Sequence, residues 1–187
     1  MKRGNAAGCI IMIAALMVVF TFGFAQASPV VRLELVEDAP LPIGGIFEIR
    51  VFADAGPLEI VAFGFDLIGA APSLTFNGVT VAPQFRMTSP SFENTDVAGI
   101  SSPVGGIVTG NDVLLASLFF TGNHPGRFSV GIFSDLTDLN EGLFFPPPTT
   151  PLDMSTTIDI IVAVPLPPAV FLLSSGLATL LFIRRRI

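Results

Sequence analysis

Few side chains in this 187-residue chain could take part in catalysis. His124 is the single histidine, and it lies in a Gly-Asn-His-Pro-Gly segment whose composition is typical of a turn. No Gly-x-Ser-x-Gly elbow accompanies it, so a Ser-His-Asp hydrolase has no recognisable nucleophile. We therefore expect a protein that is not an enzyme, with a hydrolase of unrecognised type as the remaining alternative.

Oxygen ligands are concentrated in one segment, Asp135-Leu136-Thr137-Asp138-Leu139-Asn140-Glu141-Gly142. Ca²⁺ takes six to eight oxygen ligands, often from acidic loops. Asp135, Asp138 and Glu141 are therefore the candidate calcium ligands, although their spacing is not that of an EF-hand loop. The alternative is a solvated acidic turn without an ion. We expect no other cofactor, because a transition-metal site needs more than one histidine or cysteine.

The C-terminal segment carries chemistry of another kind, because it presents peptide bonds for cleavage. Val164-Pro165-Leu166-Pro167-Pro168-Ala169 leads into an apolar run that ends at Ile183 and is followed by Arg184-Arg185-Arg186. The prolines favour an extended backbone that a protease cleft can bind without an ordering cost. The apolar run gives roughly 22 Å of helix, short of the roughly 30 Å hydrocarbon core. The arginines hold the C-terminus on the cytoplasmic side. This order predicts a temporary membrane anchor, with a plain single-span anchor as the alternative.

This tail resembles the PEP-CTERM sorting signal in its Val-Pro-Leu-Pro-Ala variant, with Pro168 inserted before Ala169. The resemblance covers residues 164–187 and implies cleavage by exosortase, a membrane-embedded cysteine transpeptidase of Gram-negative bacteria that make exopolysaccharide. The Gram-positive sortase signal, Leu-Pro-any-Thr-Gly, is a second comparison. Leu166-Pro167-Pro168-Ala169-Val170 keeps only its first two specified positions.

The N-terminal segment has the pattern of a secretory signal peptide. Lys2 and Arg3 precede an apolar core from Cys9 to Phe20, and Ala25-Gln26-Ala27 supplies a small-x-small cleavage pattern before Ser28. Both ends predict the same topology, with residues 28–163 outside the inner membrane and the arginine tail inside.

The composition between the two ends limits what this protein binds. Residues 28–163 contain no cysteine and no lysine, and four arginines stand against all fifteen acidic residues, a net charge of −11. Nucleic-acid binding requires a basic face, so we expect no nucleic-acid partner, and binding to anionic lipid surfaces is disfavoured for the same reason. A domain without disulfides must be held by its hydrophobic core.

Apolar and polar residues alternate along short runs that glycine and proline separate, which predicts an all-β domain. Phe47, Ile49, Val51 and Ala53 form one face of the run 47–54. One face of the next run consists of Val61, Phe63, Phe65 and Leu67. Asn77-Gly78 predicts a hairpin turn. Further strands are expected over 113–121, 128–133 and 158–162. Eight or nine such strands need a facing sheet, so we predict a β-sandwich of jelly-roll type.

Two stretches, 47–67 and 114–132, resemble cohesin-like sandwich domains, and the resemblance implies a topology only. Most of the eighteen phenylalanines fall on apolar strand faces and are expected in the core. Those that could form an exposed platform are Phe52, Phe92, Phe144 and Phe145.

These patterns predict three parts: a signal peptide (residues 1–27), a single β-sandwich (28–163) and a C-terminal sorting signal (164–187). The expected role is structural or adhesive, in the cell envelope or the extracellular matrix, linked to exopolysaccharide and biofilm. The expected partners are an exosortase-type transpeptidase, the membrane before processing, and exopolysaccharide. The alternative is a calcium- or carbohydrate-binding module displayed on a simple membrane anchor.

Overall fold

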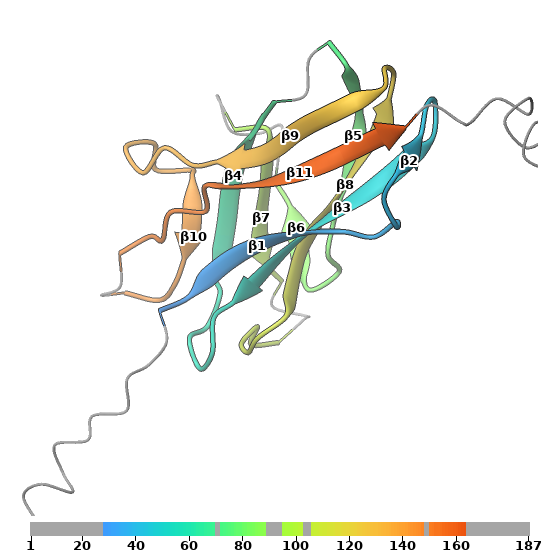
Figure 1. Cartoon of the computed structure of the whole chain (residues 1–187). Helices are drawn as coiled ribbons and strands as arrows, with labels where there is room; N and C mark the ends of the chain where they lie inside the picture. Colours follow the sequence, from blue (N-terminus) through green and yellow to red (C-terminus); the bar gives the residue numbers. More distant parts are fainter. Residues whose placement is uncertain (1–27, 70–71, 89–94, 103–105, 148–149, 164–187) are drawn as a thin grey trace, which may run out of the picture.

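The computed structural model describes residues 28–69, 72–88, 95–102, 106–147 and 150–163, and these form two packed β-sheets without a helix (Figure 1). The all-β sandwich prediction is confirmed. The strands are β1 (Val30–Leu35), β2 (Leu41–Pro42), β3 (Ile46–Asp54), β4 (Ala62–Ile68), β5 (Leu74–Val81), β6 (Phe85–Met87), β7 (Val97–Ser101), β8 (Val113–Gly122), β9 (Gly126–Phe133), β10 (Gly142–Phe144) and β11 (Thr156–Ala163).

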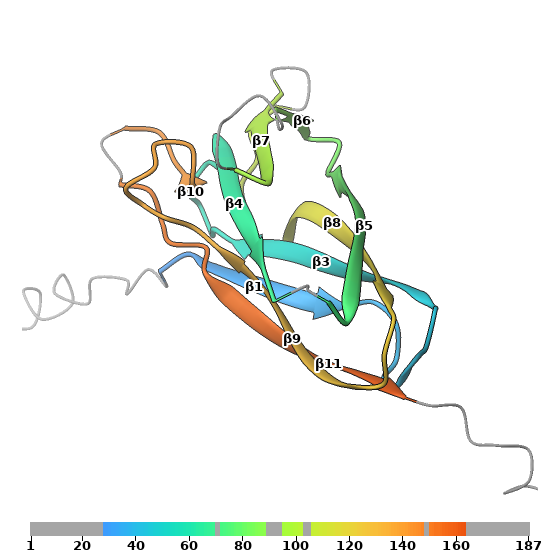
Figure 2. The ribbon, with the colours of Figure 1, turned by 90° about the horizontal axis from the view of Figure 1, so that it is seen from above.

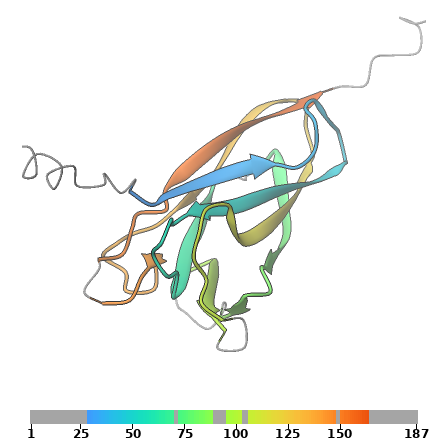
Figure 3. The same ribbon diagram turned by 90° about the horizontal axis from the view of Figure 1, so that it is seen from below.

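The smaller sheet has the order β1-β3-β8-β5, and the larger one has the order β2-β11-β9-β4-β7-β6, with β10 paired to β4. Every strand pairing is antiparallel except that of β11 with β2, which is parallel. Along one edge of the sandwich, β1 of the smaller sheet lies beside β11 of the larger sheet (Figures 2 and 3).

The predicted alternation places side chains correctly in β3 and β4. Phe47, Ile49, Val51 and Ala53 are all buried, as are Phe63 and Phe65 of the facing sheet. The Phe47 and Phe120 rings stack at 5.8 Å, and Phe63 meets Phe85 edge-on at 5.1 Å. Each fully buried side chain of this size contributes roughly 1.5–3 kcal/mol, so aromatic packing takes the place of disulfides in this core.

The predicted hairpin at Asn77-Gly78 is wrong. Leu74–Val81 is one continuous strand, β5, and its register against β8 shifts between Phe76 and Gly78. Gly78 has a φ of 140°, and the Asn77 side chain donates to the Thr121 hydroxyl at 2.8 Å. An extra residue held in this way is a β-bulge. The chain does not reverse because β8 is ten residues long and pairs with both halves of β5.

The eleven strands found in the described residues exceed the eight or nine predicted. The strands without a predicted counterpart are β2, β6, β7 and β10. β2, β6 and β10 are two or three residues long, too short to show an alternating pattern. β7 shows no alternation because its first three residues are all buried. The last strand, predicted over 158–162, begins earlier, at Thr156, and ends at Ala163. Its Ile160 and Val162 side chains are buried in the core.

Candidate functional site

The last strand, β11, ends at Ala163, the residue directly before the predicted sorting motif. β11 pairs with β9 from Thr156 to Val162, and with β2 through Val162–Leu41 and Ala163–Pro42. The predicted motif begins at Val164, so no spacer residue separates it from the sheet.

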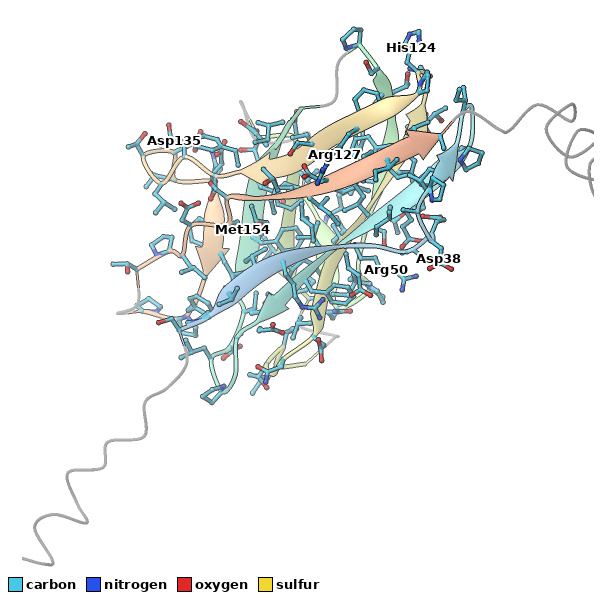
Figure 4. The ribbon with its side chains drawn as sticks, viewed as in Figure 1. Asp38, Arg50, His124, Arg127, Asp135 and Met154 are labelled. Atoms are coloured by element: carbon cyan, nitrogen blue, oxygen red, sulfur yellow. The ribbon has the colours of Figure 1, made fainter. Side chains whose placement is uncertain are left out.

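The described residues have their two chain ends at opposite ends of the sandwich. β1 begins at one end, and β11 finishes at the other (Figure 1). Ser28, which follows the predicted signal-peptidase site, is exposed. His124 lies exposed in the turn between β8 and β9, at the end where β11 finishes (Figure 4).

Most of the predicted processing residues lie outside the described residues. They are Ala25, Ala27, Val164, Pro165, Leu166, Pro167, Pro168, Ala169, Arg184, Arg185 and Arg186. The signal peptide, the sorting motif and the arginine stop therefore stay predictions. Within the described ranges, we find no helix with the length and hydropathy that crossing a membrane requires.

The candidate calcium ligands lie in the loop between β9 and β10, where each carboxylate binds the loop itself. Asp135 Oδ1 accepts hydrogen bonds from the N–H of Thr137 at 2.9 Å and from its hydroxyl at 2.7 Å. Asp138 Oδ1 accepts from the N–H of Asn140 at 2.9 Å, and Glu141 Oε2 accepts from the N–H of Asp135. The described residues contain no group of three or more His, Cys, Asp or Glu side chains that could hold a metal ion. Calcium binding by this loop stays a prediction without support from the geometry.

Glu141 differs from Asp135 and Asp138 because it is buried, with 2% of its surface exposed. Burial raises the pKa of Glu141 above its ordinary value, and the charges of Asp66, Asp138 and Asp135 raise it further. The hydrogen bond from the Asp135 N–H acts in the opposite direction. Two hydrogen bonds from Thr137 hold the pKa of Asp135 below its ordinary value.

The raised pKa of Glu141 predicts a pH effect on stability. The folded state binds this proton more tightly than the unfolded state does, so the contribution of Glu141 is fully present below its ordinary pKa of 4.5. It is lost as the pH rises through the raised value. Glu141→Gln should therefore raise the thermal unfolding midpoint at pH 7 and have little effect at pH 4. Thermal scans of both proteins between pH 4 and 7 measure the difference, and an equal change at both pH values would contradict it.

An apolar depression of about 170 Å³ lies on the outer face of the larger sheet. Its floor consists of small residues of neighbouring strands, including Ala62 of β4 and Ala98 of β7. Phe144, Ile100 and Leu139 also line it, and Leu139 is 90% exposed. Phe144, Ile100 and Leu139 face solvent because nothing in the described part of the chain covers them.

The loop that carries Leu139 lies directly against the outer side of β4. A Cβ added to Gly64 would lie 1.9 Å from the backbone oxygen of Asn140. Glycine is the only residue type that allows this approach at position 64, because any side chain would collide with the backbone of the loop. The Phe63-Gly64-Phe65 sequence thus positions one wall of the depression.

The phenylalanines that could form a platform have different surroundings. Phe145 is buried, and Phe92 lies outside the described residues. Phe52 is half-buried, and the guanidinium carbon of Arg32 lies 4.5 Å from its ring centroid. Phe144 is half-buried and lines the apolar depression. Of the three that the structure describes, Phe144 is the one that lines this depression.

No model of a known protein family matches the sequence, and no curated protein matches it significantly. Among solved structures, the cohesin module of a family 33 glycoside hydrolase from Clostridium perfringens ATCC13124 is similar, with a TM-score of 0.56 and 12% sequence identity. The match covers 75% of this chain and 100% of that module. The seventh ScaB type I cohesin from Pseudobacteroides cellulosolvens has a TM-score of 0.47 and 15% identity, over 74% of this chain and 95% of that one. The first match confirms the predicted cohesin-like sandwich as a likeness of fold.

Proposed function

We propose that this protein is an exported, non-catalytic module of the cell envelope or extracellular matrix, and that an exosortase-type transpeptidase releases it from its C-terminal anchor. The observation that supports this is the position of β11. The sheet is complete at Ala163, and the predicted motif starts at the next residue. Cleavage between residues 164 and 169 would leave every strand pairing of the sandwich intact.

Charge and shape support the same proposal. The net charge of −11 between residues 28 and 163 gives the sandwich no electrostatic attraction to an anionic lipid surface, so charge does not oppose its release. Before release, the end of the sandwich with the β8–β9 turn would face the bilayer. The end at which β1 begins would point away from it (Figure 1).

Deletion of the transpeptidase gene in the native host tests this proposal. We expect the protein to remain in the inner-membrane fraction of the deletion strain and to regain its extracellular location when the gene is restored. An unchanged extracellular location in the deletion strain would contradict the proposal.

The adhesive form of this role is favoured by the apolar depression. Aromatic and aliphatic side chains in a cavity supply contact area, and a few polar groups fix the orientation of a ligand. Asn140 lines the cavity, and so does Thr88, whose buried Oγ1 has no hydrogen-bond partner within the described ranges. The candidate ligand is the exopolysaccharide of the host.

A pair of phenylalanine variants tests this binding role. Phe144→Ala should weaken retention on immobilised exopolysaccharide about two- to tenfold, because one stacked ring contributes on the order of 0.5–1.5 kcal/mol. Phe52→Ala is the matched control, since the Phe52 ring packs against Arg32. Equal retention of the wild type and both variants would remove the depression as the binding surface.

A further inference from the structure

A second depression, of about 580 Å³, lies at the end of the sandwich where β1 begins. Two loops far apart in the sequence form it together with the start of β1. One loop follows β3, and the other precedes β8. The lining residues are Ser28, Val30, Asp54, Gly56, Pro57, Asn111 and Asp112.

The two loops are bound firmly to each other. The N–H of Ala55 donates to Gly110 O at 2.9 Å, and the N–H of Gly110 donates to Gly56 O at 2.7 Å. The N–H of Asp112 donates to Asp54 Oδ1 at 2.7 Å. These bonds fix the positions of the two aspartates on the wall of the depression.

Carboxylates outnumber cations around this second depression. Arg32 forms ion pairs with Glu34 at 3.0 Å, with Asp54 at 3.6 Å and with Asp112. One guanidinium therefore faces three carboxylates, which leaves a formal charge of −2. The side chains of Asp54 and Asp112 are 34% and 76% exposed, so both remain accessible to a second cation.

We propose that this depression binds the chain's own α-ammonium group, which forms at Ser28 when the signal peptide is removed. Ser28 already lies in the depression as one of its lining residues. Hydrolysis of the Ala27–Ser28 bond adds water across it, leaving a carboxylate on Ala27 and an ammonium on Ser28. This inference rests on the export step of the proposed function.

The site would couple processing to the fold. In the precursor, the Ser28 nitrogen is an uncharged amide and cannot balance Asp54 and Asp112. After cleavage, the positive charge of the Ser28 ammonium attracts Asp54 and Asp112. This attraction holds the start of the edge strand β1 against the loop that follows β3 and the loop that precedes β8. Cleavage thus completes an ion cluster that also contains Arg32.

The composition makes this group easy to observe. Lys2 is the only lysine of the chain, so a chain that begins at Ser28 has a single primary amine. Reductive methylation with ¹³C-formaldehyde labels that amine alone, and its NMR signal can be titrated.

The experiment uses the chain from Ser28 to Ile187 in detergent, with Ser28 freed from an N-terminal tag by a protease that leaves no extra residue. Partly exposed carboxylates should raise the pKa of this amine by roughly half a unit above that of an equally methylated amine outside the depression. Asp54→Asn and Asp112→Asn should each remove much of this rise. Asparagine is well suited to the φ of 56° at position 112, so the second variant keeps the loop geometry.

Two controls make the result decisive. Asp38→Asn removes a carboxylate near the other end of β1 and should leave the amine unchanged (Figure 4). A chain that starts at Ala25 displaces the amine by three residues and should show an ordinary value. The same pKa in the wild type, in Asp54→Asn, in Asp112→Asn and in the chain from Ala25 would overturn the proposal. The N-terminal mass of the protein from its host tests the export step separately.

Discussion

Release of the protein from the inner membrane is expected to stop almost completely when Pro165 and Pro167 are both replaced by alanine. Proline fixes φ and lacks an N–H, so we expect these residues to favour an extended motif before the apolar run. Alanine supplies the missing donors and leaves φ free, so the segment is no longer held extended before it binds. An extended-backbone cleft must then order the segment as it binds, and this ordering costs free energy of binding. Fractionation of host cells and immunodetection of the protein measure the released share.

A double variant of Pro125 and Pro147 is the matched control for this experiment. Both prolines are exposed and lie in described loops outside the motif. Their replacement by alanine removes the same number of rings and should leave release unchanged. Normal release of the Pro165/Pro167 variant would show that the motif is not what the processing enzyme recognises.

Phe120→Ala should lower the free energy of unfolding by about 3–5 kcal/mol, the range for removal of a large buried aromatic side chain. Phe120 has no exposed surface, and its ring lies 5.8 Å from that of Phe47 and 5.4 Å from that of Phe76. It belongs to β8, which pairs with both β3 and β5, so the cavity would open at the centre of the smaller sheet. Marginally stable domains have only about 5–15 kcal/mol in total, so this variant should be close to unfolding at 37 °C.

Urea unfolding followed by circular dichroism measures this loss, with Phe133→Ala as the control. Phe133 lies at the end of β9 and is 45% exposed, so its removal should cost less than about 1 kcal/mol. Equal losses for the two variants would mean that the smaller sheet does not pack as described.

The strands that the sequence predicts correctly are those with one apolar face and several alternations. β3 is the clearest example, because four buried residues alternate with polar ones over the strand. The hairpin prediction at Asn77-Gly78 is wrong because the local turn preference competes with pairing to β8. The hydrogen bonds to this long strand outweigh the turn preference. β2, β6 and β10 could not be predicted, since tertiary contacts alone define strands of two or three residues.

Each of the two depressions forms where segments far apart in the sequence lie close together, and local sequence patterns do not predict such contacts. The outer-face depression exists because the loop containing Asn140 lies on Gly64, about 75 positions earlier in the chain. A lone glycine between two phenylalanines was the one signal available for it. The depression at Ser28 joins loops around positions 55 and 111, which only the pairing of β3 with β8 brings together.

Mass spectrometry of the protein from its native host tests the central claim most directly. We expect a C-terminus between Val164 and Ala169, at the end of a sandwich that is complete at Ala163. A mature protein that still ends in Arg184-Arg185-Arg186-Ile187 would contradict processing and leave a tethered surface protein.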